Sequence, residues 1–250
     1  MLAKYIKFCV VGATGALITW SLTYSLTEFG GWWYMASAVT ATLIAMTWNF
    51  MWNLKWTFKE QRTPETPDYE WHAFYNGSII QRWWKQSLAK IVWDWIPNAS
   101  DIINVGCGSS PIATQYPNAE NIDVDEKKLA YMRTKTRGNF HYGDAMRIPY
   151  EDGIFDHAIC IEVIEHVTQP EKALAEIARV LKPGGNLVIA TPDYAKRRWH
   201  LAEMFTPYKE WHGSKLTKSA LEALARNAGF ELKRFQYVAG CDLVEEFVKA

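Results

Sequence analysis

Glycines and a carboxylate follow two short apolar runs in the second half of the chain. The run Ile102–Val105 leads directly into Gly106 and Gly108, and Asp123 ends the next run about 15 residues later. Because glycine lacks a Cβ atom, the backbone can turn sharply there and approach a ligand closely. A carboxylate after the second run can accept hydrogen bonds from both hydroxyls of a ribose. The pattern predicts a nucleoside site; the alternatives are a tight turn at the glycines and a helix N-cap at Asp123.

A third apolar run, Phe140–Tyr142, is followed by Gly143, Asp144 and Ala145. The Asp144 carboxylate can accept a hydrogen bond from an adenine amino group, and the Ala145 amide can donate one to a ring nitrogen. The alternative is an aspartate that only shapes a turn.

A fourth apolar run, Phe155–Ile161, is followed by Glu162, Glu165 and His166. Imidazole titrates near neutral pH, so His166 is the candidate general base, with the two glutamates as further catalytic candidates. The alternative for His166 is to pack against or cap the following loop.

The apolar runs alternate with amphipathic helices. One helix is predicted to begin near Pro170 and to stop at Pro183, and another to begin at Thr217 or Ser219, each with an apolar run after it. Strands alternating with helices of this length predict an α/β fold with a doubly wound, mostly parallel sheet. Ligands of such sheets bind beyond the carboxyl ends of the strands, where the polar residues above gather.

From about residue 78 to residue 240 the chain resembles the class I S-adenosylmethionine-dependent methyltransferases, especially their small-molecule branch. The matching motifs are Val105-Gly106-Cys107-Gly108-Ser109, Ile122-Asp123, Gly143-Asp144-Ala145, Ile148-Pro149-Tyr150, Phe155-Asp156, Glu162-Val163-Ile164-Glu165-His166-Val167 and Leu181-Lys182-Pro183-Gly184-Gly185. The resemblance implies a seven-stranded, Rossmann-like sheet, S-adenosylmethionine as cofactor, and direct displacement of its methyl group by a substrate atom. The cofactor-binding residues that it implies are Asn104, Gly106, Cys107, Gly108, Asp123, Val124, Asp144, Ala145 and Ile161.

This chain departs from the family at Asn104, where an acidic residue is common. An amide can hydrogen-bond the methionine end of the cofactor, but it cannot offset the ammonium charge. The departure implies either lower affinity or compensation by another carboxylate.

Three other kinds of site are disfavoured. A dinucleotide site would continue as GxGxxG, whereas Gly108 is followed by Ser109, Ser110 and Pro111. Runs similar to residues 162–166 bind a divalent metal in one RNA-methylating branch, but further ligands such as His200 or His212 are not specified by their spacing, so no metal is expected. The 27 basic and 27 acidic residues balance, which argues against nucleic acid as a partner.

The first 60 residues contain two long uncharged runs. No charge occurs between Lys7 and Glu28, or between Glu28 and Lys55, and each run is long enough to cross a bilayer as a helix of about 20 residues. The predicted structure is a transmembrane hairpin, and a buried hairpin of a soluble protein is the alternative. Lysines flank the outer ends of the two runs and are absent from the turn, so the positive-inside rule places both termini in the cytoplasm of a multi-pass protein of the cell (inner) membrane. Asn49 and Asn53 are expected to face a partner or the interface rather than lipid.

This segment resembles the GtrA-like family of small membrane proteins over about residues 4–59. The matching residues are Lys7-Phe8, Val11-Gly12, Trp48-Asn49-Phe50 and Asn53-Leu54-Lys55-Trp56-Thr57-Phe58. The resemblance implies an association with polyprenyl-linked sugar pathways. The family usually has four spans and this chain has two, which puts an independent transport role in doubt and suggests a homo-oligomer through the membrane helices.

The predicted organisation is therefore a hairpin over 1–59, a linker over 60–70 and a methyltransferase domain over 71–250. A helix is predicted from Trp71 to Trp95, whose cations Arg82, Lys85 and Lys90 lie at the membrane face, over the cofactor or in solvent. The segment from 193 to 215 is rich in basic and aromatic residues, so it either covers the substrate or forms an ordinary surface loop.

Two functions follow from this organisation. The first is a membrane-anchored methyltransferase acting on a lipid-linked or amphiphilic acceptor, such as a polyprenyl-linked sugar or a quinone precursor, at the cytoplasmic face. The second is a non-catalytic, cofactor-binding regulator joined to a membrane module that binds polyprenyl phosphate.

Overall fold

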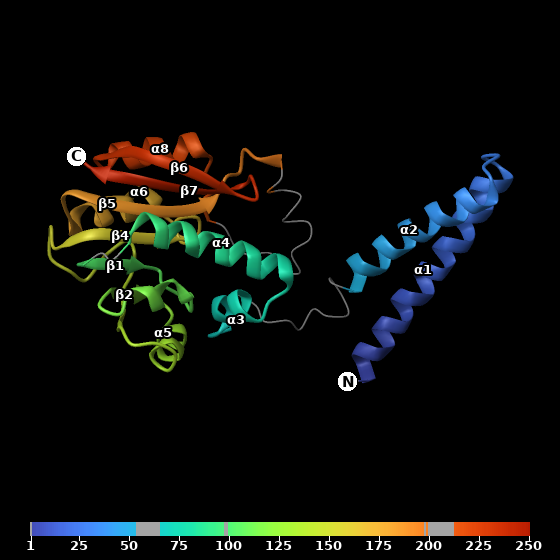
Figure 1. Cartoon of the computed structure of the whole chain (residues 1–250), viewed down its shortest axis with the longest axis horizontal. Coiled ribbons are helices and arrows are strands. Elements are labelled where there is room, and N and C mark those ends of the chain that lie inside the picture. Colours follow the sequence, from blue (N-terminus) through green and yellow to red (C-terminus); the bar gives the residue numbers. More distant parts are fainter. Residues whose placement is uncertain (1, 54–65, 98–99, 198, 200–212) are drawn as a thin grey trace. The chain divides into compact units, whose positions relative to one another are not determined.

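The computed structural model describes residues 2–53, 66–97, 100–197, 199 and 213–250 (Figure 1). It divides into two compact units. The first is built on two helices, α1 (Leu2–Glu28) and α2 (Tyr34–Trp52). The second contains all the later helices and strands.

The two helices of the first unit pack through small residues. Ala41, Ala45 and Ser37 of α2 are buried, and Gly15 of α1 lies against the amide of Asn49, because a Cβ built on Gly15 would be 2.7 Å from Asn49 Cγ. The expectation that Asn49 faces a partner helix is therefore confirmed for this pair. Asn53 also has a buried side-chain oxygen.

Large apolar side chains of the hairpin point outward instead of inward. Leu17, Trp20 and Met46 are 65%, 71% and 62% exposed. Soluble proteins bury such residues, whereas helices in lipid pack through small residues and present large ones to the acyl chains. The arrangement therefore supports the membrane hairpin over a buried hairpin.

Among the described helices, α1 is long and apolar enough from Tyr5 to Glu28 to cross a bilayer, and it is the only one to pass this test. The 19-residue α2 contains no charged residue but has three Thr, two Trp and one Asn. A second span at α2 and the side of the membrane on which the termini lie stay predictions.

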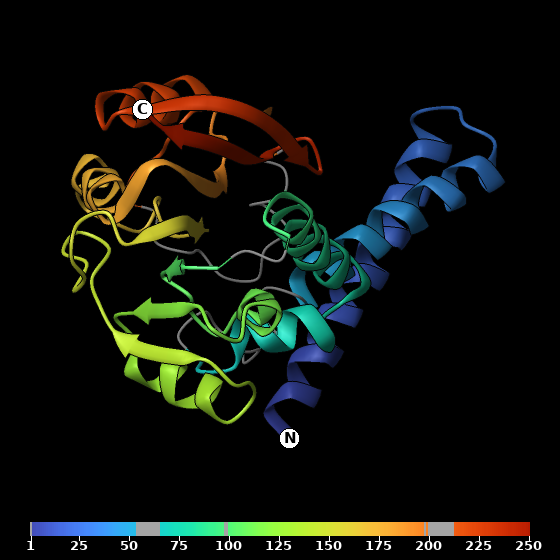
Figure 2. The ribbon, with the colours of Figure 1, turned by 60° about the vertical axis from the view of Figure 1, so that its left-hand side comes forward.

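The second unit is built around one seven-stranded sheet. The strands are β1 (Ile102–Val105), β2 (Glu120–Asp123), β3 (Asn139–Tyr142), β4 (Phe155–Ile161), β5 (Leu181–Pro192), β6 (Phe230–Val238) and β7 (Asp242–Lys249). Their order is β3-β2-β1-β4-β5-β7-β6, and Figure 2 shows the strands side by side, with the red β6 and β7 at the top. The first five strands are parallel, and β7 runs antiparallel to both β5 and β6. The predicted mostly parallel, doubly wound sheet is confirmed.

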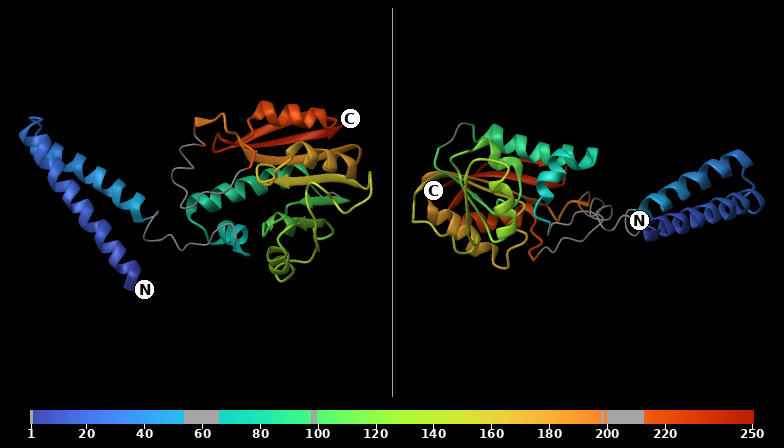
Figure 3. Two further views of the ribbon diagram at one scale, coloured as in Figure 1. Left: turned by 180° about the vertical axis from the view of Figure 1, so that it is seen from behind. Right: turned by 90° about the horizontal axis from the view of Figure 1, so that it is seen from below.

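Helices cover both faces of this sheet. On one face lie α4 (Ile79–Trp95), the short helix η2 (Pro111–Gln115) and α5 (Glu126–Arg133). On the other lie α6 (Pro170–Val180) and α8 (Lys218–Asn227). In the view of Figure 1, α4 lies in front of the sheet, and in the rear view of Figure 3 α6 does. The central strands β1, β4 and β5 are therefore mostly buried, as a parallel sheet covered on both faces requires.

The helix predicted from Trp71 to Trp95 is two helices. A short α3 (Tyr69–Tyr75) precedes α4, and the chain turns between them at Gly77. Ser78 ends the turn by a capping box: its hydroxyl accepts from Gln81 N, and the Gln81 side chain accepts from Ser78 N. Tyr69 and Glu70, which were predicted to belong to a linker, are part of α3.

Candidate functional site

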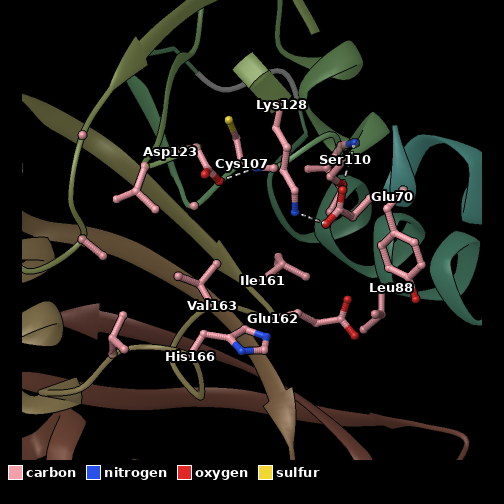
Figure 4. Close-up of a pocket in the computed structure, with 18 of the residues that line it drawn as sticks. Glu70, Leu88, Cys107, Ser110, Asp123, Lys128, Ile161, Glu162, Val163 and His166 are labelled. Carbon is pink, nitrogen blue, oxygen red and sulfur yellow. Dashed lines mark hydrogen bonds and ion pairs between the residues drawn. The ribbon is translucent and has the colours of Figure 1, made fainter. Parts of the chain in front are cut away.

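A cavity of about 390 Å³ lies at the carboxyl ends of β1 to β4, between the strand ends and helices α3, α4 and α5 (Figure 4). Ten of the twelve site residues predicted from the sequence line it. They are Gly106, Cys107, Gly108, Asp123, Val124, Asp144, Ala145, Ile161, Glu162 and His166. The fold thus brings residues up to 60 positions apart into one small-molecule-sized space.

The loop after β1 has a backbone that favours glycine at two positions. Gly106 and Gly108 have φ angles of +68° and +51°. At Gly106 a Cβ would also lie 2.7 Å from Val163 Cγ1. The amides of Gly106 and Cys107 both donate to Ile122 O, at 2.8 and 3.0 Å, which fixes the loop to the end of β2.

Asp123 connects this loop to the start of α5. Its two carboxylate oxygens accept one amide each, from Gly108 N and Asp125 N, both at 2.8 Å. Each oxygen keeps a second lone pair for a ligand hydroxyl. Burial raises the pKa of this carboxyl, although the two amides and Lys128 oppose the shift. The alternative that Asp123 caps a helix is wrong, because the N-cap of α5 is Asp125.

Asp144 shapes a turn and also lines the cavity. Its Oδ1 accepts from Met146 N at 2.8 Å, which is the turn role that was its alternative. The neighbouring Ala145 is buried and lines the cavity as well. The turn fixes the orientation of the carboxylate, so the two roles are compatible.

Glu162 and His166 lie on the opposite side of the cavity from Asp123 (Figure 4). Glu162 has a φ of +56°, a left-handed conformation that is unfavourable for a residue with a side chain, and its amide donates to Ala190 O at 2.8 Å. Its carboxylate forms an ion pair with Lys85 of α4. The predicted position of Lys85 over the ligand site is therefore supported, and the solvent-exposed alternative is not.

Two predicted site residues are not among those that line the cavity. Asn104 is 4% exposed and donates through Nδ2 to Asn121 Oδ1 at 3.0 Å, so its amide is used inside the sheet. Glu165 is 1% exposed, and burial raises the pKa of its carboxyl well above the usual range. Because this carboxyl group is buried outside the cavity, it is not placed to take a proton from a ligand there. The assignment of these two residues to the site is thus corrected.

Glu70 and Lys128 line the cavity although no sequence pattern singles them out. Lys128 Nζ is 2.8 Å from Glu70 Oε1, and Glu70 Oε2 accepts from the hydroxyl and, at 3.2 Å, the amide of Ser109. Burial alone would raise the pKa of Glu70, but the Lys128 ammonium and these hydrogen bonds lower it overall. A charged carboxylate therefore lies beside Gly108. A strand-end pattern could not identify it, because Glu70 belongs to a helix that precedes the sheet.

The segment from 193 to 215 is described only in part. Asp193 is buried and accepts from the Tyr237 hydroxyl at 2.7 Å, and Lys196 lies over the Tyr237 ring. The candidate metal ligands His200 and His212 lie outside the described residues, as does most of the aromatic part of the segment.

Comparison with known proteins identifies both units. Residues 103–189 match the family described as "Methyltransferase domain". The second unit is an S-adenosylmethionine-dependent methyltransferase domain. Residues 7–112 match the family described as "GtrA/DPMS, transmembrane domain", so the resemblance of the first unit is confirmed as well.

Curated relatives match over only part of their own length. A probable S-adenosylmethionine-dependent methyltransferase of Mycolicibacterium smegmatis is 29% identical over 138 residues, 53% of this chain and 52% of that protein. A ubiquinone biosynthesis O-methyltransferase of Dechloromonas aromatica is 28% identical over 138 residues, 46% of this chain and 60% of that protein. The chain thus spans about half the length of the curated relatives it matches.

Solved structures share the fold of the methyltransferase domain. A protein of Pyrococcus horikoshii superposes with a TM-score of 0.62 at 17% identity, covering 73% of this chain and 98% of that chain. The magnesium protoporphyrin IX methyltransferase of Synechocystis, solved with bound SAH, gives a TM-score of 0.59 at 15% identity and covers 75% of this chain and 96% of that chain.

Proposed function

We propose that this protein is a membrane-anchored methyltransferase that moves a methyl group from S-adenosylmethionine to a lipid-linked or amphiphilic acceptor at the cytoplasmic face. The observation that carries this proposal is the cavity, which places the Asp123 carboxylate on one side and the His166 imidazole on the other. Its volume of about 390 Å³ lies in the range of small-molecule sites, roughly 300–1,000 Å³.

The residues of the glycine-loop side fit the cofactor. Asp123 would accept the ribose hydroxyls, and Asp144 with the Ala145 amide would hold the adenine. Glu70 would lie near the ammonium of the methionine end, and so supply the carboxylate that Asn104 does not. When bound, S-adenosylmethionine supplies a methyl group activated by a sulfonium leaving group.

On the other side, His166 would accept the proton of an acceptor hydroxyl as the new bond to carbon forms. Lys85 would hold Glu162 in a fixed orientation beside it. Apart from this proton transfer, these residues would align the acceptor with the methyl group, because correct positioning of the two reactants is the main source of rate enhancement in a displacement.

The acceptor class follows from the membrane unit. An acceptor held in the bilayer meets a tethered enzyme at a high effective concentration. A quinone precursor is consistent with the name of the Dechloromonas relative, and a polyprenyl-linked sugar with the GtrA-like segment. The outward apolar surface of α1 and α2 would contact lipid or a second copy of the chain.

The proposal is tested by calorimetric titration of the detergent-solubilised chain with S-adenosylmethionine. Asp123→Asn is expected to weaken binding about tenfold or more, because a ribose acceptor is lost. Asp125→Asn is the matched control: this residue caps α5 and is not among those that line the cavity. Equal affinities for both variants and the native chain, in folded preparations, would exclude the assigned site.

A second experiment separates an enzyme from the non-catalytic regulator. Isotope-labelled S-adenosylmethionine is incubated with the chain in membranes containing a lipid extract. If the native chain transfers label to the lipid fraction and the His166→Asn variant does not, the result supports the enzyme. Saturable cofactor binding without any transfer of label supports the regulator. The main argument for a regulator was Asn104, which lacks a charge, and the carboxylate of Glu70 in the cavity weakens that argument.

A further inference from the structure

Helix α4 begins with an exposed apolar patch. Ile79, Ile80 and Trp83 are 78%, 71% and 52% exposed, and their spacing places them together on the first two turns. We call these three residues the α4 tip. Farther along the same helix Leu88 and Val92 are buried against the sheet, so the sheet covers the later turns and leaves the tip uncovered.

The α4 tip has the composition of a helix that enters a membrane interface. The helix carries the cations Arg82, Lys85 and Lys90. Lys85 and Lys90 form ion pairs with Glu162 and Asp94, so Arg82 is the cation that the tip offers to an anionic headgroup. Tryptophan and aliphatic residues beside cations favour the boundary between headgroups and acyl chains, above all when the lipids are anionic. A contiguous exposed apolar patch is typical of an interaction surface, whereas single exposed apolar residues are not.

The α4 tip lies close to the cavity. Lys85 and Leu88 of the same helix line the cavity. Ile80 precedes Lys85 by five residues, which is about 7.5 Å along the helix axis. In α3, the exposed Tyr75 follows Phe74, which also lines the cavity. Five residues also turn about 140° around the axis, so Lys85 lies within two turns of the α4 tip but on another face of the helix.

The chain keeps a bilayer within reach of this surface. Sixteen residues separate Trp52, the last residue of α2, from Tyr69, the first of α3. Fully extended they span at most about 55 Å. A patch tethered at this length needs only weak affinity to stay bound, because its effective concentration at the membrane is high.

We propose that the α4 tip inserts at the interface of an anionic bilayer, the one in which the hairpin is embedded, and so holds the cavity within about two helical turns of the lipid. The proposal rests on the proposed function in one respect, the membrane anchoring of α1 and α2. It adds a second membrane contact, made by the methyltransferase domain itself, which keeps the cavity close to an acceptor held in the bilayer.

The test uses the full chain in nanodiscs of phosphatidylcholine and phosphatidylglycerol. In a Cys9→Ser background, where the other three cysteines are buried, Ile80→Cys is labelled with a nitroxide. Its collision rates with oxygen, which concentrates in lipid, and with chelated nickel, which stays in water, are measured by power saturation. Lys172→Cys is the matched control, because it is exposed on α6 at the opposite face of the sheet.

The ratio of oxygen to nickel collisions is expected to be several-fold higher at position 80 than at position 172. It is expected to fall towards the control value in nanodiscs of phosphatidylcholine alone. Equal ratios at the two positions in anionic nanodiscs would overturn the proposal, and a high ratio without anionic lipid would overturn the part given to Arg82. A label on the native Cys9 reports on α1 separately, so failure of the membrane anchor is distinguished from failure of the α4 tip.

Discussion

Gly106→Ala is expected to destabilise the methyltransferase domain by about 3 kcal/mol. Two independent costs add up to this value. The φ of +68° costs a residue with a Cβ about 1–2 kcal/mol. The new methyl would also lie 2.7 Å from Val163 Cγ1 and 3.1 Å from Val163 Cβ, and overpacking of this kind costs about 1–3 kcal/mol. Because Cβ itself is close, rotation of the Val163 side chain does not remove the overlap.

The matched control for this variant is Gly153→Ala. Gly153 has a similar φ of +64°, but nothing among the described residues lies within 4 Å of its Cβ position. It should therefore lose the conformational part alone, about 1–2 kcal/mol. The double variant Gly106→Ala/Val163→Ala removes the two Cγ contacts and leaves only the 3.1 Å contact with Cβ of residue 163, so it should recover much of the difference between the two glycines.

The measurement is thermal unfolding of the full chain in detergent, followed by circular dichroism. For a domain of this size 1 kcal/mol corresponds to about 2–4 °C in Tm, so Gly106→Ala should lower Tm by about 6–12 °C and Gly153→Ala by about 2–8 °C. If both variants lowered Tm equally, the close approach of Val163 to the glycine loop would be refuted. If the double variant gained nothing over Gly106→Ala, the additive reasoning would fail.

Three further outcomes follow from the cavity and from β7. Glu70→Gln should weaken S-adenosylmethionine about tenfold but leave 5′-methylthioadenosine, which lacks the ammonium, unchanged; equal losses in calorimetry would remove Glu70 from the methionine end. His166→Asn should lower kcat about 100-fold at unchanged cofactor affinity, and a retained kcat would remove it as the base. Burial raises the pKa of Glu245 to about 8, so the folded state holds a proton that the unfolded state loses near its usual 4.5. The folded state therefore becomes less stable relative to the unfolded state as the pH rises from 4.5 to 8. Glu245→Gln removes this titration, so the decline of Tm between pH 5 and 8 should become flatter.

The parallel core of the sheet could be predicted because local and global signals agree there. Ile102–Val105 and Phe155–Ile161 are apolar runs that end at glycine or at polar residues, which is the pattern of buried parallel strands. Because the carboxyl ends of parallel strands meet at one edge, the sequence is enough to assign Asp123, Asp144 and His166 to one site.

Strand β7 could not be predicted, because its sequence contradicts its burial. Asp242, Glu245 and Glu246 lie in it with 0%, 0% and 1% exposure. The first two are offset by residues that are distant in the sequence: Trp84 donates to Asp242 at 2.7 Å, and Lys218 lies 3.6 Å from Glu245. Burial of a carboxyl group requires such partners, and only the tertiary fold shows them.

The same limit explains why the prediction included Asn104, which does not line the cavity, and did not include Glu70, which does. Motif matching placed the contact with the methionine end of the cofactor on β1, at Asn104. That side chain is instead hydrogen-bonded to Asn121 within the sheet. The carboxylate beside Gly108 that the motifs missed is Glu70, which reaches the glycine loop from α3, the first described helix after α2. Since Glu70 and Lys128 stabilise each other across the cavity wall, the cofactor side of the cavity depends on a segment outside the strand ends. A chain truncated before α4 would keep every strand-end motif and still lose this carboxylate, so the motifs alone do not define the site.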